Sequence, residues 1–190
     1  MNKNTHYFWA VRLPDFVKQN IQDELTNVKG IFQFKRWVHK NDLHITLAFL
    51  GSVEDQQQLQ SVINTVGHAI KDEKAFPLQV QGLNVFGSNK SPRIFWAAVN
   101  HEKNLFQVQK IVHRKCQEVG FTLENRTYHP HITLARNWTG QEEFNSELLE
   151  KYNPFCEKPL SFQAEEVVLY KTNLEEIPKY EPIAVFSLLT

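Results

Sequence analysis

One five-residue sequence, His-Ile-Thr-Leu-Ala, occurs twice in the chain, at residues 44–48 and 131–135. The two copies lie 131 − 44 = 87 residues apart, and the sequence Phe-Trp-Ala recurs at the same interval, at residues 8–10 and 95–97. Eight identical residues at one offset indicate a duplicated supersecondary unit rather than chance matches. The chain is therefore expected to fold by using the same unit twice.

The length and composition fit one globular domain or two small lobes. The chain has 190 residues and is 42% hydrophobic, which is enough for a substantial core. Lysine and arginine together number 21, as do aspartate and glutamate, so any phosphate site must be local rather than part of a global field. The two cysteines have no paired spacing, and no apolar segment has the length of a membrane span or signal peptide. These features predict a soluble cytoplasmic protein.

The first half of the chain alternates predicted strands and helices. A strand at residues 7–13 precedes a helix that begins after Pro14, and residues 43–50 form the strand that carries the first motif. A helix capped at Ser52 and a strand at residues 76–86 follow. This half is a β-α-β-α-β unit.

The second half repeats this order and adds one strand. Its predicted elements are a strand at residues 93–99, a helix closed by Gly120, a strand at 128–136, a helix opened by the capping pair Thr139 and Glu142, and a strand at 160–170. A last apolar strand at residues 183–189 is expected to be buried in a sheet. Because the connections are short, we expect residues 1–190 to form a single bilobal domain, with His44 and His131 meeting in a groove between the lobes.

Strand alternation assigns a chemistry to the repeated motif. His44 and Thr46 share one face of their strand about 7 Å apart, the apolar residues between them share the other face, and the same holds for His131 and Thr133. Two imidazoles can supply one base and one acid near neutral pH, and the hydroxyls can donate to the oxygens of a charged transition state. Cleavage of a phosphodiester with an alkoxide leaving group meets these requirements without a metal.

The surrounding residues resemble a known family. Residues 41–51 and 128–136 are similar to the signatures of the two-histidine phosphoesterases, and more narrowly of the LigT/ThpR-type RNA 2′,3′-cyclic phosphodiesterases. The resemblance implies an α+β fold of two lobes, each an antiparallel sheet with outer helices. It also implies a hydrolase that converts 2′,3′-cyclic phosphate ends to 2′-phosphomonoesters. The residue pattern alone leaves parallel and antiparallel pairing open.

The resemblance also implies roles for individual residues. His44 would protonate the departing 3′ oxygen and His131 would activate water, although the sequence does not decide between them and the roles would exchange in the ligating direction. Arg136 stands where these enzymes carry an arginine, which implies a phosphate or base contact, and a guanidinium suits a phosphate. Phe49 holds the corresponding place in the first motif, so the site is asymmetric.

Aromatic residues near the motifs are candidates for a stacking surface. Phe8, Trp9 and Tyr128 could stack on a terminal base, although aromatic residues in strands more often belong to the core. We expect RNA ends or small cyclic nucleotides as partners, no cofactor or metal, no membrane association and a monomer.

Three alternatives stay open at this level. The first is a non-catalytic module that binds RNA ends or nucleotides. The second is an enzyme of the same class with another substrate, such as a 2′-5′ linkage or an ADP-ribose cyclic phosphate. The third is a metal site built on the His129-Pro130-His131 spacing, although no carboxylate stands at a recognisable ligand spacing. Cys116 lies in a helical apolar stripe and is expected to pack rather than react.

Overall fold

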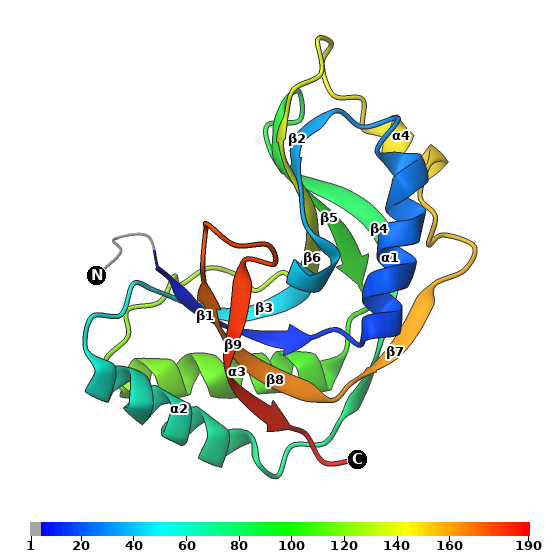
Figure 1. Cartoon of the computed structure of the whole chain (residues 1–190). Helices are drawn as coiled ribbons and strands as arrows, with labels where there is room; N and C mark the ends of the chain where they lie inside the picture. Colours follow the sequence, from blue (N-terminus) through cyan, green and yellow to red (C-terminus); the bar gives the residue numbers. More distant parts are fainter. Residues whose placement is uncertain (1–4) are drawn as a thin grey trace.

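The computed structural model describes residues 5–190. Its strands are β1 Tyr7–Arg12, β2 Phe34–Trp37, β3 His44–Gly51, β4 Phe76–Gly87, β5 Pro92–Val99, β6 His131–Trp138, β7 Leu160–Ala164, β8 Glu166–Thr172 and β9 Tyr180–Ser187. Its helices are α1 Asp15–Val28, α2 Gln56–Ile70, α3 Lys103–Glu118, α4 Glu147–Lys151 and the short 3₁₀ helix η1 Lys40–Asp42. The pairings between these strands are antiparallel. The predicted α+β fold with an antiparallel sheet is therefore confirmed (Figure 1).

One hydrogen-bonded sheet runs through both halves of the chain, where we expected a separate sheet in each lobe. Its order is β7-β4-β5-β6-β3-β1-β8-β9, with β2 beside β6. In Figure 1, β2, β5 and α4 lie at one end of the molecule and α2 and α3 at the other, with β3 and β6 between them. The halves join where Ile45 of β3 pairs with Ile132 of β6, so both histidine motifs lie at this junction.

Both histidine strands carry an irregularity at the same point. Leu47 in β3 has no partner in β1, because residues 9 and 10 pair with residues 48 and 46. Leu134 in β6 likewise has no partner in β5, because residues 95 and 96 pair with residues 135 and 133. An extra residue of this kind is a β-bulge, which bends the strand and changes the direction of the following side chains. Beyond each bulge the next residue is again buried, and the one after it is exposed.

The two Phe-Trp-Ala sequences do not occupy equivalent positions. Trp9 pairs with Ala48, whereas it is Phe95 that pairs with Ala135. The offset between β1 and β5 is thus 95 − 9 = 86, one residue less than between the histidine strands. Because side chains alternate, Trp9 lies in the main core while Trp96 lies beside His131. The predicted register of this part of the repeat is wrong by one residue.

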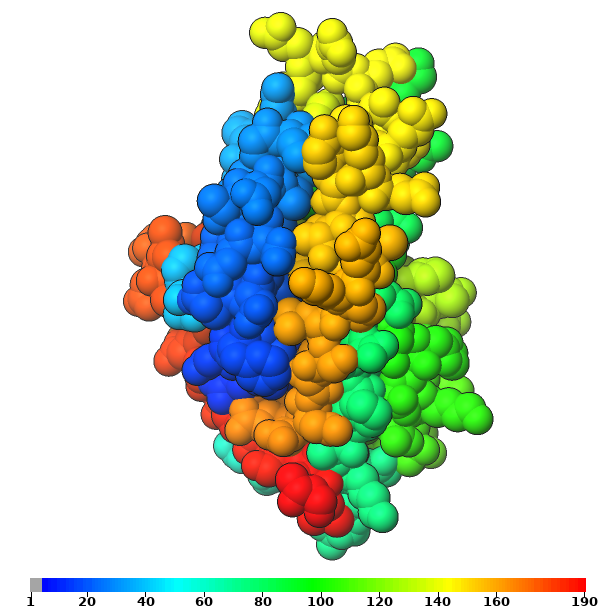
Figure 2. Space-filling model, turned by 90° about the vertical axis from the view of Figure 1, so that its right-hand side faces the viewer, coloured from blue at the N-terminus to red at the C-terminus, as the bar shows by residue number. Residues whose placement is uncertain are grey.

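The helices bury the faces that their apolar spacing predicts. In α1, Val17, Ile21, Leu25 and Val28 are all buried in the main core. Figure 2 shows α1 lying lengthwise beside the segment that contains α4 and β7. Helices α2 and α3 contact each other at the opposite end of the molecule (Figure 1). None of the helices in residues 5–190 has the length and apolar character needed to cross a membrane.

The helix predicted from the capping pair Thr139 and Glu142 does not form. The amide and the hydroxyl of Thr139 both donate to the carbonyl of Gln33, at 2.8 and 2.9 Å. The indole of Trp138 donates to the carbonyl of Glu142 at 3.1 Å. The two tertiary hydrogen bonds of Thr139 use its amide and hydroxyl, which would have served in the cap, and the helix of this region is the short α4 further along the chain.

Three other predicted boundaries shift. Helix α2 is capped by Asp55, whose carboxylate accepts from the Gln57 amide at 2.8 Å, rather than by Ser52. The strand predicted at residues 160–170 is divided into β7 and β8. The last strand, β9, lies at the edge of the sheet beside β8, and its exposed side chains include Val185 at 44% exposure, so it is not the buried strand we expected.

Candidate active site

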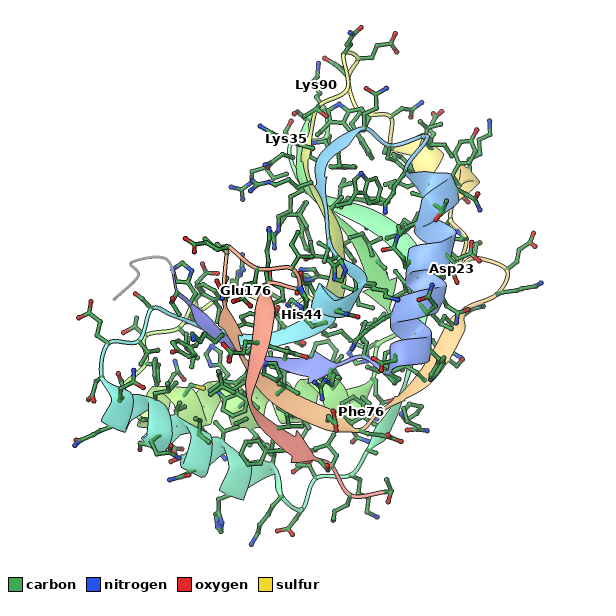
Figure 3. All side chains as sticks on the ribbon, in the orientation of Figure 1. Asp23, Lys35, His44, Phe76, Lys90 and Glu176 are labelled. Atoms are coloured by element: carbon green, nitrogen blue, oxygen red, sulfur yellow. The ribbon has the colours of Figure 1, made fainter. Side chains whose placement is uncertain are left out.

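The two predicted histidines begin adjacent strands on either side of one residue pair. His44 precedes Ile45 in β3, and His131 precedes Ile132 in β6. The two isoleucines are fully buried, whereas both histidines are half-buried, so the imidazoles lie on the face opposite the main core. Figure 3 shows His44 near the middle of the molecule, between its two ends.

The antiparallel register brings the polar positions of the two motifs together. Because Ile45 lies opposite Ile132 in antiparallel strands, His44 lies towards Thr133 and Thr46 lies towards His131. Thr46 and Thr133 are both half-buried, like the histidines. The structure thus places the four residues around the Ile45–Ile132 pair.

Each imidazole is held by the backbone two residues before it. The Nδ1 atom of His44 lies 2.7 Å from the carbonyl oxygen of Asp42, and Nδ1 of His131 lies 2.7 Å from that of His129. A carbonyl oxygen only accepts, so we assign the proton to Nδ1 in both rings. This leaves Nε2 as the atom that can take or give a proton. In His44, Nε2 is 3.1 Å from the Thr46 hydroxyl, which donates to it in this tautomer.

Burial disfavours the charged form of both histidines. It lowers the pKa of His44 to about 4, and the positive charges at His131 and Arg136 act in the same direction. The bond to the Asp42 carbonyl opposes this shift. Burial also lowers the pKa of His131, again with Arg136 contributing. Both imidazoles are therefore neutral near pH 7 in the free protein.

Aromatic rings surround His44. Phe8 lies 4.8 Å from the His44 ring between centroids, and Tyr180 meets the same ring edge-on at 5.2 Å. Tyr170 lies slightly further away, at 6.1 Å. These contacts restrict the ring to one orientation and limit its access to water. The sequence analysis did not assign Tyr170 or Tyr180 to the site.

His131 has a corresponding aromatic frame. Phe86 meets its ring edge-on at 5.0 Å and Trp96 at 5.6 Å, and Phe86 and Trp96 stack on each other at 4.6 Å. Both aromatic residues come from β4 and β5 on the far side of β6. The repeated Phe-Trp-Ala sequence was a possible signal for Trp96. The one-residue change in register meant that the repeat did not predict its contact with His131.

The expected stacking residues take other roles. Phe8 is 4% exposed and packs in a small cluster with Tyr170, and Trp9 is fully buried in the main core, so neither has a free face for a base. The prediction of base stacking is wrong for both residues. Tyr128 donates from its hydroxyl to the carbonyl of Thr46 at 3.0 Å and so fixes β3. A stacking role for Tyr128 stays a prediction.

Asp42 is a further residue of the site that sequence reasoning missed. Its side chain is buried, and one carboxylate oxygen accepts from the amides of Lys179 and Tyr180, at 2.8 and 3.1 Å. Its own carbonyl holds His44. Asp42 therefore ties the end of the loop between β8 and β9, and the first residue of β9, Tyr180, to the backbone that orients His44. The only available signal was its place two residues before the motif.

The remaining predicted groups lie as follows. Arg136 is exposed on β6 and pairs with Arg36 of β2 on one side and Ile94 of β5 on the other. Cys116 is fully buried, and burial raises the pKa of its thiol to about 12, consistent with packing. His129 contributes its carbonyl to the orientation of His131. Within residues 5–190, no three His, Cys, Asp or Glu side chains are grouped as metal ligands would be.

Solved structures share this fold. LigT of E. coli, crystallised with 3′-AMP, matches with a TM-score of 0.78 at 21% identity over 98% of this chain and 99% of that one. TT0787 of Thermus thermophilus matches with a TM-score of 0.78 at 21% identity over 96% and 97%. At this identity the likeness concerns the fold alone.

The sequence itself defines the family. The model of the 2′-5′ RNA ligase superfamily matches residues 17–176, and the chain belongs to this superfamily. Proteins named RNA 2′,3′-cyclic phosphodiesterase are its relatives. That of Geobacillus stearothermophilus is 38% identical over 187 residues, which make up 98% of this chain but 58% of that protein. That of Bacillus subtilis strain 168 is 33% identical over 183 residues, 96% of each chain. The resemblance inferred from the two motifs is confirmed.

Proposed function

We propose that the chain is an RNA 2′,3′-cyclic phosphodiesterase that hydrolyses 2′,3′-cyclic phosphate ends to 2′-phosphomonoesters. The observation that carries the proposal is the pair of imidazoles on adjacent strands, each with Nδ1 held by a backbone carbonyl and Nε2 left for proton transfer. The relatives of the chain carry the name of this activity, and E. coli LigT has been crystallised with 3′-AMP. Both facts support a nucleotide substrate.

In this mechanism the two histidines divide the proton transfers. His131 takes a proton from water as it attacks the phosphorus, and His44 gives a proton to the departing 3′ oxygen. The assignment follows the family resemblance. Thr46 and Thr133 would donate to the non-bridging oxygens as their charge grows, and Arg136 would add a fixed positive charge. These groups complete the reaction without a cofactor.

The acid must be charged before it can act, and the free protein leaves His44 neutral at pH 7. A bound phosphate carries negative charge, which favours the protonated imidazole and raises its pKa. Substrate binding therefore favours the protonated form of the acid, and the assigned roles require His131 to be neutral, as the base, when water attacks. The aromatic residues around both rings lower the local dielectric and so strengthen the interaction between the phosphate and an imidazolium.

We also propose that the chain is a duplicated, bilobal domain with the site between its lobes. Ile45 pairs with Ile132, which is 45 + 87, and Leu78 pairs with Phe162, which is 78 + 84. Each pair joins positions that the two repeat offsets make equivalent. Such self-pairing is expected where a pseudo-twofold axis crosses a sheet. It supports the view that two copies of one unit each supply a histidine.

The test is the product formed by the purified protein. An oligonucleotide with a 2′,3′-cyclic phosphate end, incubated in the presence of a chelator, should gain a 2′-phosphate signal in ³¹P NMR. His68→Ala, which changes an exposed histidine on α2, should give the same product at the same rate. Unchanged ends would reject catalysis and favour a binding module. A 3′-phosphate product would contradict the assigned leaving group, and a rate that needs added divalent metal would revive the metal alternative.

A further inference from the structure

Two arginines face each other across neighbouring strands beside the candidate site. Arg36 of β2 is directly opposite Arg136 of β6 in the antiparallel ladder. Directly opposed residues have their Cβ atoms about 5 Å apart on the same face of the sheet, and like charges at such positions are destabilising. Both side chains are exposed. This arrangement is unfavourable for the free protein, so folding alone does not explain it.

Among the described residues, no carboxylate forms an ion pair with either arginine. Across residues 5–190, the ion pairs include Arg12 with Glu166, Arg114 with Glu118 and Arg126 with Glu124, but none involves Arg36 or Arg136. Lys35 precedes Arg36 on β2, so strand alternation directs its side chain to the other face and it is not part of the arginine pair. In Figure 3, Lys35 lies on the side of β2 away from α1 and its Asp23. The arginine pair thus has unused hydrogen-bond donors and an uncompensated charge.

The pair lies close enough to the histidines to act on the same ligand. Arg136 follows His131 on β6, five residues or roughly 15 Å further along the strand at the usual rise per residue. Its charge lowers the pKa of both His44 and His131, which places its guanidinium within electrostatic reach of the site. Arg36 is joined to His44 through η1. An anion held between the arginines would therefore belong to a molecule that also reaches the histidines.

We propose that Arg36 and Arg136 form a clamp for a second phosphate of the substrate, the phosphodiester on the 5′ side of the nucleotide that carries the cyclic end. A cyclic mononucleotide has one phosphate, which the histidines and threonines would hold. An oligonucleotide offers the additional anion that two opposed guanidinium groups require, and arginine forks match phosphate oxygens. The substrate class is then an RNA end rather than a free cyclic mononucleotide. This inference rests on the proposed function.

The test measures binding of unreactive ligands and does not depend on turnover. The ligands are a 2′-phosphate-ended dinucleotide, its analogue with a neutral methylphosphonate linkage, and the 2′-phosphate mononucleotide. Arg36→Gln should weaken binding of the charged dinucleotide about 10-fold. It should reduce the salt dependence by about 0.7 in log–log slope, the value of one phosphate contact on a single strand. Binding of the mononucleotide and of the neutral dinucleotide should not change.

Two controls separate the clamp from other causes. Arg93→Gln removes an exposed arginine one residue before Ile94, the β5 partner of Arg136, so alternation points it to the other face. It should bind all three ligands as the unaltered protein does. Thermal unfolding should show Arg36→Gln to be as stable as the unaltered protein or more stable.

Equal loss for the mononucleotide, equal loss in Arg93→Gln, or no loss in Arg36→Gln would each overturn the clamp. If the dinucleotide ligands behave as expected but cyclic ends are not opened, the proposed function fails while the phosphate contact stands.

Discussion

At the scale of single residues, the site depends on where each imidazole carries its proton. A bond from Nδ1 to a carbonyl fixes the tautomer of His44 and of His131, and burial keeps both rings neutral. A neutral imidazole can accept a proton as a base, whereas an imidazole must be protonated before it can act as a general acid. For His44 to act as the acid, ligand binding must therefore favour protonation of its ring.

The pKa of His44 provides a direct check of this requirement. Burial should make its ring protons titrate near pH 4 in the free protein, well below the ordinary value of 6.5. Saturation with a 2′-phosphate mononucleotide should move the midpoint upward, because the anion stabilises the imidazolium. NMR titration of the imidazole resonances, assigned with His44→Gln, measures both values. A titration midpoint near 6.5 without ligand, or a midpoint that does not rise when ligand binds, would contradict the proposal that ligand binding favours protonation of His44.

The sequence predicted the arrangement of the motif residues better than it predicted their surroundings. Strand alternation within one motif was enough to place His44 and Thr46 on one face, because both belong to one short segment. Tyr180 and Asp42 act through a contact between segments 138 residues apart, which no local pattern reveals. The stacking expected of Phe8 failed because its aromatic ring is needed to pack against His44.

At the scale of elements, the loop between β8 and β9 is tied to the start of β3. The Asp42 carboxylate accepts from the Lys179 amide at the end of that loop and from the Tyr180 amide at the start of β9, and these bonds place the Tyr180 ring against His44. The 3₁₀ helix η1 ends at Asp42, two residues before His44. A short helix and a distant loop thus orient one catalytic candidate together.

Substitution of Asp42 should separate this positioning role from binding. Asp42→Ala leaves two amides without their acceptor and should cost about 1–3 kcal/mol of unfolding free energy. Through the displaced Tyr180 and His44 it should lower kcat about 10- to 100-fold with a smaller effect on KM. Asp42→Asn keeps an acceptor oxygen and should restore most of kcat. An alanine variant with normal kcat would show that the contact does not orient His44.

Helix α2 and the edge strand β9 approach each other at a glycine. A Cβ atom added at Gly67 would collide with the ring of Phe186. Gly67→Ala should therefore destabilise the protein by about 1–3 kcal/mol, although alanine favours the helix by up to about 1 kcal/mol. Chemical denaturation measures the difference, with Ala69→Gly as a helix-propensity control. A more stable Gly67→Ala protein would mean that β9 does not pack closely on α2.

Local signals predicted the elements unevenly. The apolar spacing of α1 predicted its buried face because that face packs along its whole length. The capping pair at Thr139 failed because Gln33, 106 residues away, takes the hydrogen bonds that the cap would use. A cap depends on one or two hydrogen bonds, which a tertiary contact can replace. The apolar stripe of α1 depends on several buried side chains along the helix.

At the scale of the whole molecule, the 87-residue offset is best preserved in the two strands that carry the histidines. The histidine strands keep the 87-residue offset and the same bulge, whereas β1 and β5 are related by 86 residues. The family resemblance carried by the motifs predicted an α+β fold with an antiparallel sheet, but the single continuous sheet could not be predicted, because the motifs do not specify how the halves pair. The proposed bilobal site needs both halves, since each contributes one histidine.

We propose that His44 and His131 act together as an acid and base pair. This claim is tested most directly by the single-turnover rate of opening a 2′,3′-cyclic end in His44→Ala, His131→Ala and the double variant, each shown to be folded. Each single variant should lose about 10²- to 10⁴-fold in rate, and the double variant should be little slower than the slower single one, because one transfer without the other gains little. Full activity in either single variant, or losses that multiply in the double variant, would contradict the claim.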